Sequence, residues 1–128
     1  MNTLGIDFGL SKIGLAIATA KIAEPLDVIH YKNKELMLDQ IKMICFNEKI
    51  QRIVIGISEG KTAEETQKFV DEIKHRIYAQ VFTYDETLST QDAQAMAIEA
   101  GMKRSKRHEM EDAMAAAIML QNYLDSND

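Results

Sequence analysis

Three acidic positions far apart in the sequence are candidates for binding a metal ion. Asp7 lies in the first apolar segment, G-I-D-F-G; the pair Asp85 and Glu86 ends the segment V-F-T-Y-D-E; and Asp112 begins the run D-A-M-A-A-A-I-M-L. Carboxylate oxygens are hard ligands of the kind that Mg²⁺ and Mn²⁺ prefer. If the fold brings these acids together, they could hold one or two such ions, which would bind phosphate oxygens and activate water for phosphodiester hydrolysis.

Each of these acids also has a purely structural explanation. Asp7 could hydrogen-bond the backbone of the turn that follows it. One acid of the pair Asp85 and Glu86, and likewise Asp112, could interact favourably with the amino terminus of a helix, where anions are stabilised. Glu59, which follows the apolar run I-V-I-G-I, competes for the middle ligand position. That position therefore stays open between Glu59, Asp85 and Glu86.

A cluster of positive charges in the segment M-K-R-S-K-R-H indicates contact with a nucleic acid. Lys103, Arg104, Lys106 and Arg107 stand just before the last predicted helix, at the end where the helix dipole disfavours cations. A phosphate backbone passing this point would bind the cations and the helix terminus together, whereas the alternative is a solvated loop. Lys12, after the first turn, could also contact phosphate. We therefore predict a nucleic-acid partner.

Hydrophobic periodicity predicts the elements that must position these side chains. Strands are expected at 3–8, 12–19, after Pro25, 53–57 and 81–86, and helices at 35–48, 62–78, from Ser89 or Thr90 to Gly101, and 108–124. Short turns make the first strands antiparallel, while strands joined through helices are normally parallel. The expected fold is α/β, a mixed five-stranded sheet with helices on both faces. Strand 3–8 would be central, so that Asp7 needs a compensating partner.

Composition narrows the class of protein. A chain of 128 residues, 46% of them hydrophobic, is expected to form a single domain over 1–128. The net charge of −5 argues against a generic basic nucleic-acid coat protein, and the single Cys45 reads as a buried small hydrophobe. The longest apolar run, 113–120, is well short of the roughly 20 residues of a membrane span. With no basic start of a signal peptide, we expect a soluble cytoplasmic protein without a membrane partner.

The order of the motifs resembles that of a known family. G-I-D-F-G with K-I-G-L-A-I-A, then I-V-I-G-I, D-E-T-L-S-T and E-D-A-M-A-A-A-I-M-L-Q-N-Y-L follow one another as in the YqgF/RuvX family, and the resemblance spans almost the whole chain. Members are known as Holliday junction resolvases and as pre-16S rRNA nucleases. The resemblance implies a ribonuclease H-like fold and cytoplasmic, divalent-metal-dependent phosphodiester hydrolysis. Asp7, Glu86 and Asp112 match the family's catalytic and metal-binding acids.

The resemblance further implies that the substrate is the precursor of 16S ribosomal RNA, with ribosomal precursor particles as a further partner. Cleavage of branched DNA is the older inference for the family. Some positions depart from the pattern: Thr87 replaces an arginine, Ser58 replaces a proline, and Lys12 alone remains of a Lys-Arg pair. These departures bear on substrate affinity and specificity more than on the metal site.

Two other classes of function also fit part of the sequence. Nucleotide phosphotransferases have a first phosphate loop similar to G-I-D-F-G, but they close two such domains around ATP, and this chain is too short to build that cleft. A non-catalytic RNA-binding factor for ribosome assembly could keep the same fold without cleaving RNA. The sequence leaves open RNA or DNA, endonuclease or exonuclease, and monomer or homodimer, although a junction resolvase would need a symmetric pair.

Overall fold

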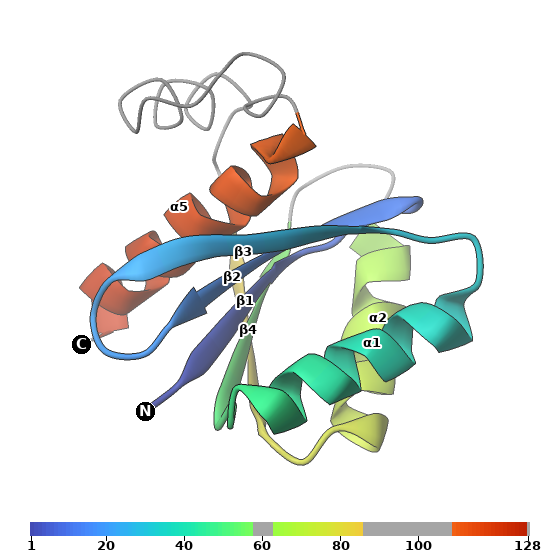
Figure 1. The fold of residues 1–128 in the computed structure, drawn as a ribbon, viewed down its shortest axis with the longest axis horizontal. Coiled ribbons are helices and arrows are strands. Elements are labelled where there is room, and N and C mark those ends of the chain that lie inside the picture. Colours follow the sequence, from blue (N-terminus) through green and yellow to red (C-terminus); the bar gives the residue numbers. More distant parts are fainter. Residues whose placement is uncertain (58–62, 86–108, 128) are drawn as a thin grey trace.

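A five-stranded mixed sheet forms the centre of the protein (Figure 1). The computed structural model describes residues 1–57, 63–85 and 109–127. The strands are β1 (Thr3–Asp7), β2 (Lys12–Ala18), β3 (Ala23–His30), β4 (Arg52–Ile57) and β5 (Gln80–Asp85), arranged in the order β3-β2-β1-β4-β5. β1 pairs antiparallel with β2 and parallel with β4. The predicted mixed sheet with the first strand at its centre is therefore confirmed.

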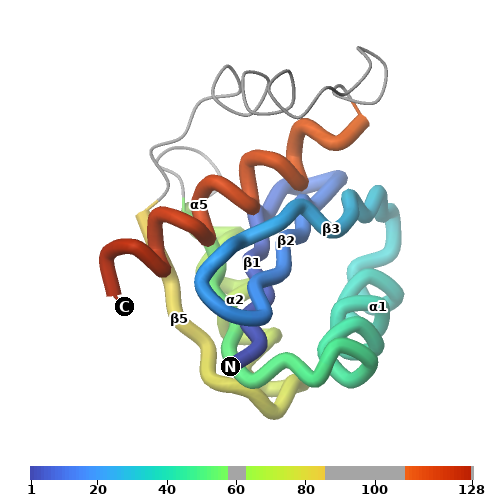
Figure 2. The backbone as a smooth tube through the Cα atoms, turned by 60° about the vertical axis from the view of Figure 1, so that its left-hand side comes forward, coloured from blue at the N-terminus to red at the C-terminus, as the bar shows by residue number. Residues whose placement is uncertain are grey.

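Helices cover both faces of this sheet, as the sequence predicted. α1 (Lys34–Asn47) and α2 (Ala63–Arg76) lie on one face, and α5 (Glu111–Asn127) crosses the other (Figures 1 and 2). α5 packs against β2, β3 and β1. The elements nearest the two ends of the chain are thus neighbours in space.

Because successive side chains of β1 point to opposite faces, the strand contributes to the packing on both sides of the sheet. Leu4 and Ile6 are fully buried against α1 and α2, and the ring of Phe8 stacks on that of Phe69 with 4.5 Å between centroids. Gly5 faces α5, where an added Cβ would lie 3.0 Å from the Cβ of Leu120. Leu4 and Ile6 therefore pack on one face of the sheet and Gly5 on the other, as the alternation of a strand requires.

The third strand begins earlier than expected. It was predicted to start after Pro25, but Pro25 lies inside β3 and is in register with Ala16. Proline has no N–H to donate, and a sheet tolerates it at an edge strand or an irregularity. Both conditions hold here, because β3 is an edge strand and its pairing with β2 shifts register between Leu15 and Ala16.

The helix boundaries agree approximately with the prediction. Asn33 caps α1, its side-chain oxygen accepting a hydrogen bond from the backbone N–H of Leu36 at 3.2 Å. α5 begins at Glu111 and continues to Asn127, whereas the prediction was 108–124. The helix predicted to end near Gly101 lies outside the described residues.

The prediction that Cys45 is buried is confirmed. This burial raises the pKa of its thiol to about 11, so the group stays protonated and unreactive at neutral pH. Met114 and Met119 of α5 are also buried core residues. In the part of the chain that the structure describes, the helices are too short or too polar to cross a membrane.

Candidate metal and nucleic-acid site

Asp7 is the last residue of β1 and lies between two glycines. It is in register with Gly14 on β2 and with Gly56 on β4, so the positions on either side of it carry no side chain. By alternation its side chain belongs to the same face as Gly5, the face that α5 covers. Asp7 is partly rather than fully buried, because it ends its strand. Strand β1 is central, as predicted, but its last residue is not fully buried.

The first turn of α5 is seated directly on Gly14. A Cβ atom there would overlap the backbone carbonyl of Asp112 and lie 2.9 Å from the nitrogen of Ala113. The helix backbone can come this close only because glycine has no side chain. Since Gly14 is in register with Asp7, the structure brings Asp7 and Asp112 to the same end of the same face, although they lie in the first strand and the last helix.

Lys12 forms an ion pair with the Asp112 carboxylate. Its Nζ lies 3.0 Å from Oδ2 of Asp112, and the two side chains are 50% and 30% exposed. The hydrogen bond to Asp112, together with the negative charge of this carboxylate, raises the pKa of Lys12 and keeps the ammonium group charged. A residue predicted to bind phosphate and a residue predicted to bind metal therefore contact one another.

Asp85 lies on the opposite face of the sheet. It is in register with Ile57, one residue beyond Gly56, and is exposed at the end of β5. Alternation turns it toward the α1 and α2 face, whereas the preceding Tyr84 packs on the α5 face. Of the three candidates for the middle ligand, Asp85 is therefore on the face away from Asp7 and Asp112.

The remaining predicted site residues lie outside the described part of the chain: Glu59, Glu86, Lys103, Arg104, Lys106 and Arg107. Among residues 1–57, 63–85 and 109–127 there is no cluster of three or more histidine, cysteine or acidic side chains suited to a metal. Two carboxylates, Asp7 and Asp112, are the part of the predicted set that the structure describes, and the third remains a prediction.

Sequence reasoning missed Gly14 and Tyr84. A signal for Gly14 was available, because a glycine inside an apolar strand often marks the close approach of another backbone. That signal was not used for the segment K-I-G-L-A. Tyr84 was read only as part of a strand, because its face follows from the register between β4 and β5.

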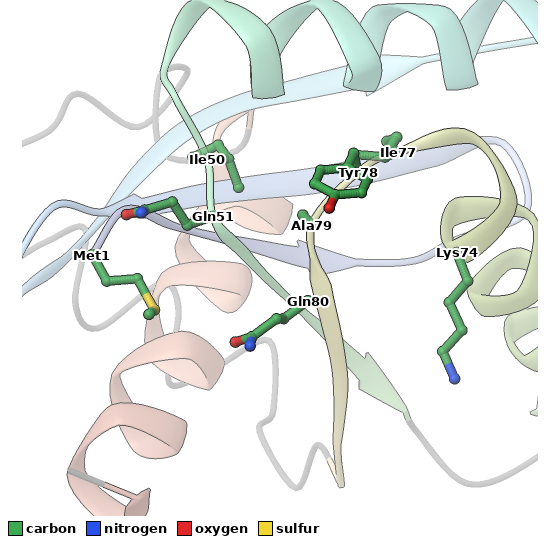
Figure 3. A pocket seen from close by; sticks show the side chains of 8 residues that line it. All are labelled: Met1, Ile50, Gln51, Lys74, Ile77, Tyr78, Ala79 and Gln80. Atoms are coloured by element: carbon green, nitrogen blue, oxygen red, sulfur yellow. The ribbon is translucent and has the colours of Figure 1, made fainter.

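A separate open pocket of about 560 Å³ lies at the other end of the sheet (Figure 3). Gln51 and Gln80, which line it, stand where β4 and β5 begin, whereas Asp7 stands where β1 ends. Lys74 and Tyr78, from the end of α2 and the segment after it, complete its rim. This pocket is therefore not part of the site at Asp7 and Asp112.

Proteins of similar sequence match almost the entire chain. The family model described as "RuvX: Holliday junction resolvase" matches residues 1–126. A relative from Endomicrobium trichonymphae is 38% identical over 95% of this chain and 94% of its own, and one from Desulforamulus reducens is 34% identical over 98% of both. Both relatives bear the name "Putative pre-16S rRNA nuclease".

Solved structures of resolvases share the fold at low sequence identity. Thermus thermophilus RuvC in complex with a Holliday junction substrate matches with a TM-score of 0.66 and 15% identity, covering 99% of this chain and 96% of its own. The fowlpox virus resolvase bound to junction DNA matches with a TM-score of 0.63 and 11% identity, over 98% of both chains. The predicted ribonuclease H-like fold is confirmed. The match along residues 1–126 and the full-length relatives together show that this chain belongs to the RuvX family.

Proposed function

We propose that the protein is a divalent-metal-dependent nuclease that processes the precursor of 16S ribosomal RNA. The observation that carries the proposal is the seating of α5 on Gly14, which brings Asp112 to the same end of the sheet as Asp7. The relatives named for pre-16S rRNA support RNA as the substrate. Such processing belongs in the cytoplasm, where ribosomal subunits are assembled.

The donor chemistry of the described residues fits a hard divalent cation, Mg²⁺ or Mn²⁺. Asp7 and Asp112 supply carboxylate oxygens from two separate elements, and the Asp112 carboxylate already accepts a cationic ammonium group. Glu86 is the proposed third ligand. When bound, the metal would neutralise phosphate charge and lower the pKa of a water molecule. Lys12 and the basic residues Lys103, Arg104, Lys106 and Arg107 are proposed to hold the phosphate backbone.

The test compares two substrates under the same conditions. The purified chain is incubated with a precursor 16S rRNA fragment and with a four-way DNA junction, each with Mg²⁺, Mn²⁺ or EDTA. We expect cleavage of the RNA with either metal, no cleavage in EDTA, and little cleavage of the junction. Preferred cutting of the junction would instead support the resolvase function for which the family is described. RNA binding without cleavage in either metal would identify a non-catalytic assembly factor.

The ion pair between Lys12 and Asp112 leads to a prediction with two opposite effects. Lys12→Gln should tighten Mn²⁺ binding by about two- to fivefold, the range set by the ~0.5–1 kcal/mol of a partly exposed ion pair. The same change should weaken RNA binding, because one cation near the phosphate path is lost. Electron paramagnetic resonance of free Mn²⁺ and fluorescence anisotropy of labelled RNA measure the two affinities.

Lys34→Gln is the matched control for this variant. Lys34 also pairs with a partly exposed acid, Glu72, but it begins α1 on the other face of the sheet. This control should leave both affinities unchanged. If Lys12→Gln behaved like Lys34→Gln, or weakened Mn²⁺ binding, then Lys12 would not compete with the metal for Asp112.

A further inference from the structure

Two aromatic residues of β5 project onto the face of the sheet that carries Asp7. Phe82 and Tyr84 both contact the ring of Tyr123, a buried residue of α5, with centroid distances of 6.2 and 6.0 Å. The rings of Tyr84 and Tyr123 meet edge to face at 86°, a favourable geometry for an aromatic pair. The guanidinium of Arg52 lies 5.3 Å from the Tyr123 ring centre. Tyr84 is therefore held against a fixed support while remaining partly exposed.

Tyr84 belongs to the same row of the sheet as Asp7. The register places Gly14, Asp7, Gly56 and Tyr84 side by side on four consecutive strands. Adjacent strands are about 4.8 Å apart, so the Cα atoms of Asp7 and Tyr84 are separated by roughly 10 Å. Gly56 is the residue between them and has no side chain. A phosphate held near Asp7 would thus place a neighbouring nucleoside within reach of the Tyr84 ring.

The row of residues that contains Phe82 does not include Asp7, although Phe82 lies on the same strand and face as Tyr84 and also contacts Tyr123. Its row contains Val54, which is buried, and Gly5, on which the side chain of Leu120 from α5 packs. The path from Phe82 to β1 is therefore filled by core side chains. The two aromatic residues differ in their access to the position of Asp7, which makes Phe82 a matched control.

We propose that Tyr84 is a substrate-positioning residue that stacks on a base of the RNA strand bound at Asp7. The inference rests on the proposed nuclease function and adds a recognition element for a single-stranded, unpaired nucleotide next to the cleaved phosphate. Stacking on an aromatic side chain tolerates every base, because each base has a π face. Tyr84 would therefore orient the strand without selecting a sequence.

The absence of tryptophan from the chain allows a direct test of stacking. Tyr84→Trp and Phe82→Trp each introduce a single tryptophan, and short single-stranded RNA is titrated in Ca²⁺, a hard cation that also binds carboxylate oxygens, with Mg²⁺ and Mn²⁺ left out. We expect quenching of the fluorescence at position 84 and none at position 82. In parallel, Tyr84→Ala should weaken RNA binding by about tenfold or more, as is usual when a base loses its aromatic partner. Tyr84→Phe should retain the affinity.

Fluorescence anisotropy of labelled RNA and cleavage with Mg²⁺ are recorded for the same samples, so that two kinds of failure are distinguished. If RNA binds and is cleaved but tryptophan at 84 is unquenched, or if 82 is quenched equally, the stacking role is wrong and the nuclease proposal stands. If tryptophan at 84 is quenched but RNA is never cleaved, stacking stands and the nuclease proposal falls. If no RNA binds, both fall. Thermal denaturation of Tyr84→Ala beside Phe82→Ala separates lost affinity from lost stability.

Discussion

Asp7→Asn is expected to remove metal-dependent cleavage while leaving the protein folded. Asparagine keeps the size of the side chain and one carbonyl oxygen, but it carries no charge to bind a cation. Loss of one electrostatic contact to a reacting centre commonly costs about 10²–10³-fold in rate, and loss of a metal ligand should cost at least as much. Single-turnover cleavage of the precursor RNA with Mg²⁺ and with Mn²⁺ measures the effect.

The fold itself should tolerate this substitution. Asp7 is partly exposed at the end of its strand, and asparagine keeps the size of the side chain and an oxygen that can accept a hydrogen bond. The midpoint of thermal unfolding should therefore change little. Normal cleavage by a well-folded Asp7→Asn protein would show that the metal is bound elsewhere.

Asp85→Asn provides the matched control for Asp7→Asn. Asp85 ends β5 at the same end of the sheet as Asp7, but the register turns its side chain to the opposite face. Its replacement should leave cleavage near the wild-type rate, whereas Glu86→Gln should reduce cleavage as strongly as Asp7→Asn. A large loss with Asp85→Asn and none with Glu86→Gln would reverse the assignment of the middle ligand.

Gly14→Ala is expected to impair both stability and activity. The new Cβ would overlap the carbonyl of Asp112, a backbone group that cannot rotate away as a side chain can. The first turn of α5 must then move off β2, at a cost of about 1–3 kcal/mol or more in the free energy of unfolding. The same movement carries Asp112 away from Asp7, so Mn²⁺ binding and cleavage should fall together. Urea denaturation and Mn²⁺ titration measure the two effects.

Gly5→Ala distinguishes loss of the site from general overpacking. Its Cβ would lie 3.0 Å from the Cβ of Leu120, so α5 must again adjust, but at a side chain two turns beyond Asp112. We expect a smaller loss of stability and retention of Mn²⁺ binding. If Gly14→Ala matched the wild type in stability and in Mn²⁺ affinity, α5 would not be seated on β2 at Asp112.

The sequence predicted the order and pairing of the strands well, because local rules govern them. A short turn after residues 3–8 requires an antiparallel neighbour, and a helical connection to 53–57 requires a parallel one, which together place β1 in the centre. The start of β3 was not predictable in the same way. Whether Pro25 can sit within a strand depends on that strand being at an edge, which is a property of the complete sheet.

The candidate site was predictable in its residue types and only partly in its contacts. Acidic residues in apolar segments pointed to Asp7 and Asp112, and the fold brings them to one end of one face. The ion pair between Lys12 and Asp112 joins residues 100 positions apart, and no periodicity encodes such a contact. The row from Gly14 to Tyr84 likewise depends on strand register, which is fixed by the assembled core. Glu86 and the four basic residues stay predictions.

The docking of α5 on Gly14 also has a consequence for when activity can arise during biosynthesis. A ribosome makes the strand that bears Asp7 before the helix that bears Asp112. A nascent chain that has not yet delivered this helix therefore holds one of the two acids and an uncovered sheet face. If Asp7 and Asp112 act together as proposed, this order would keep the chain inactive while it is still attached to the ribosome that is translating it.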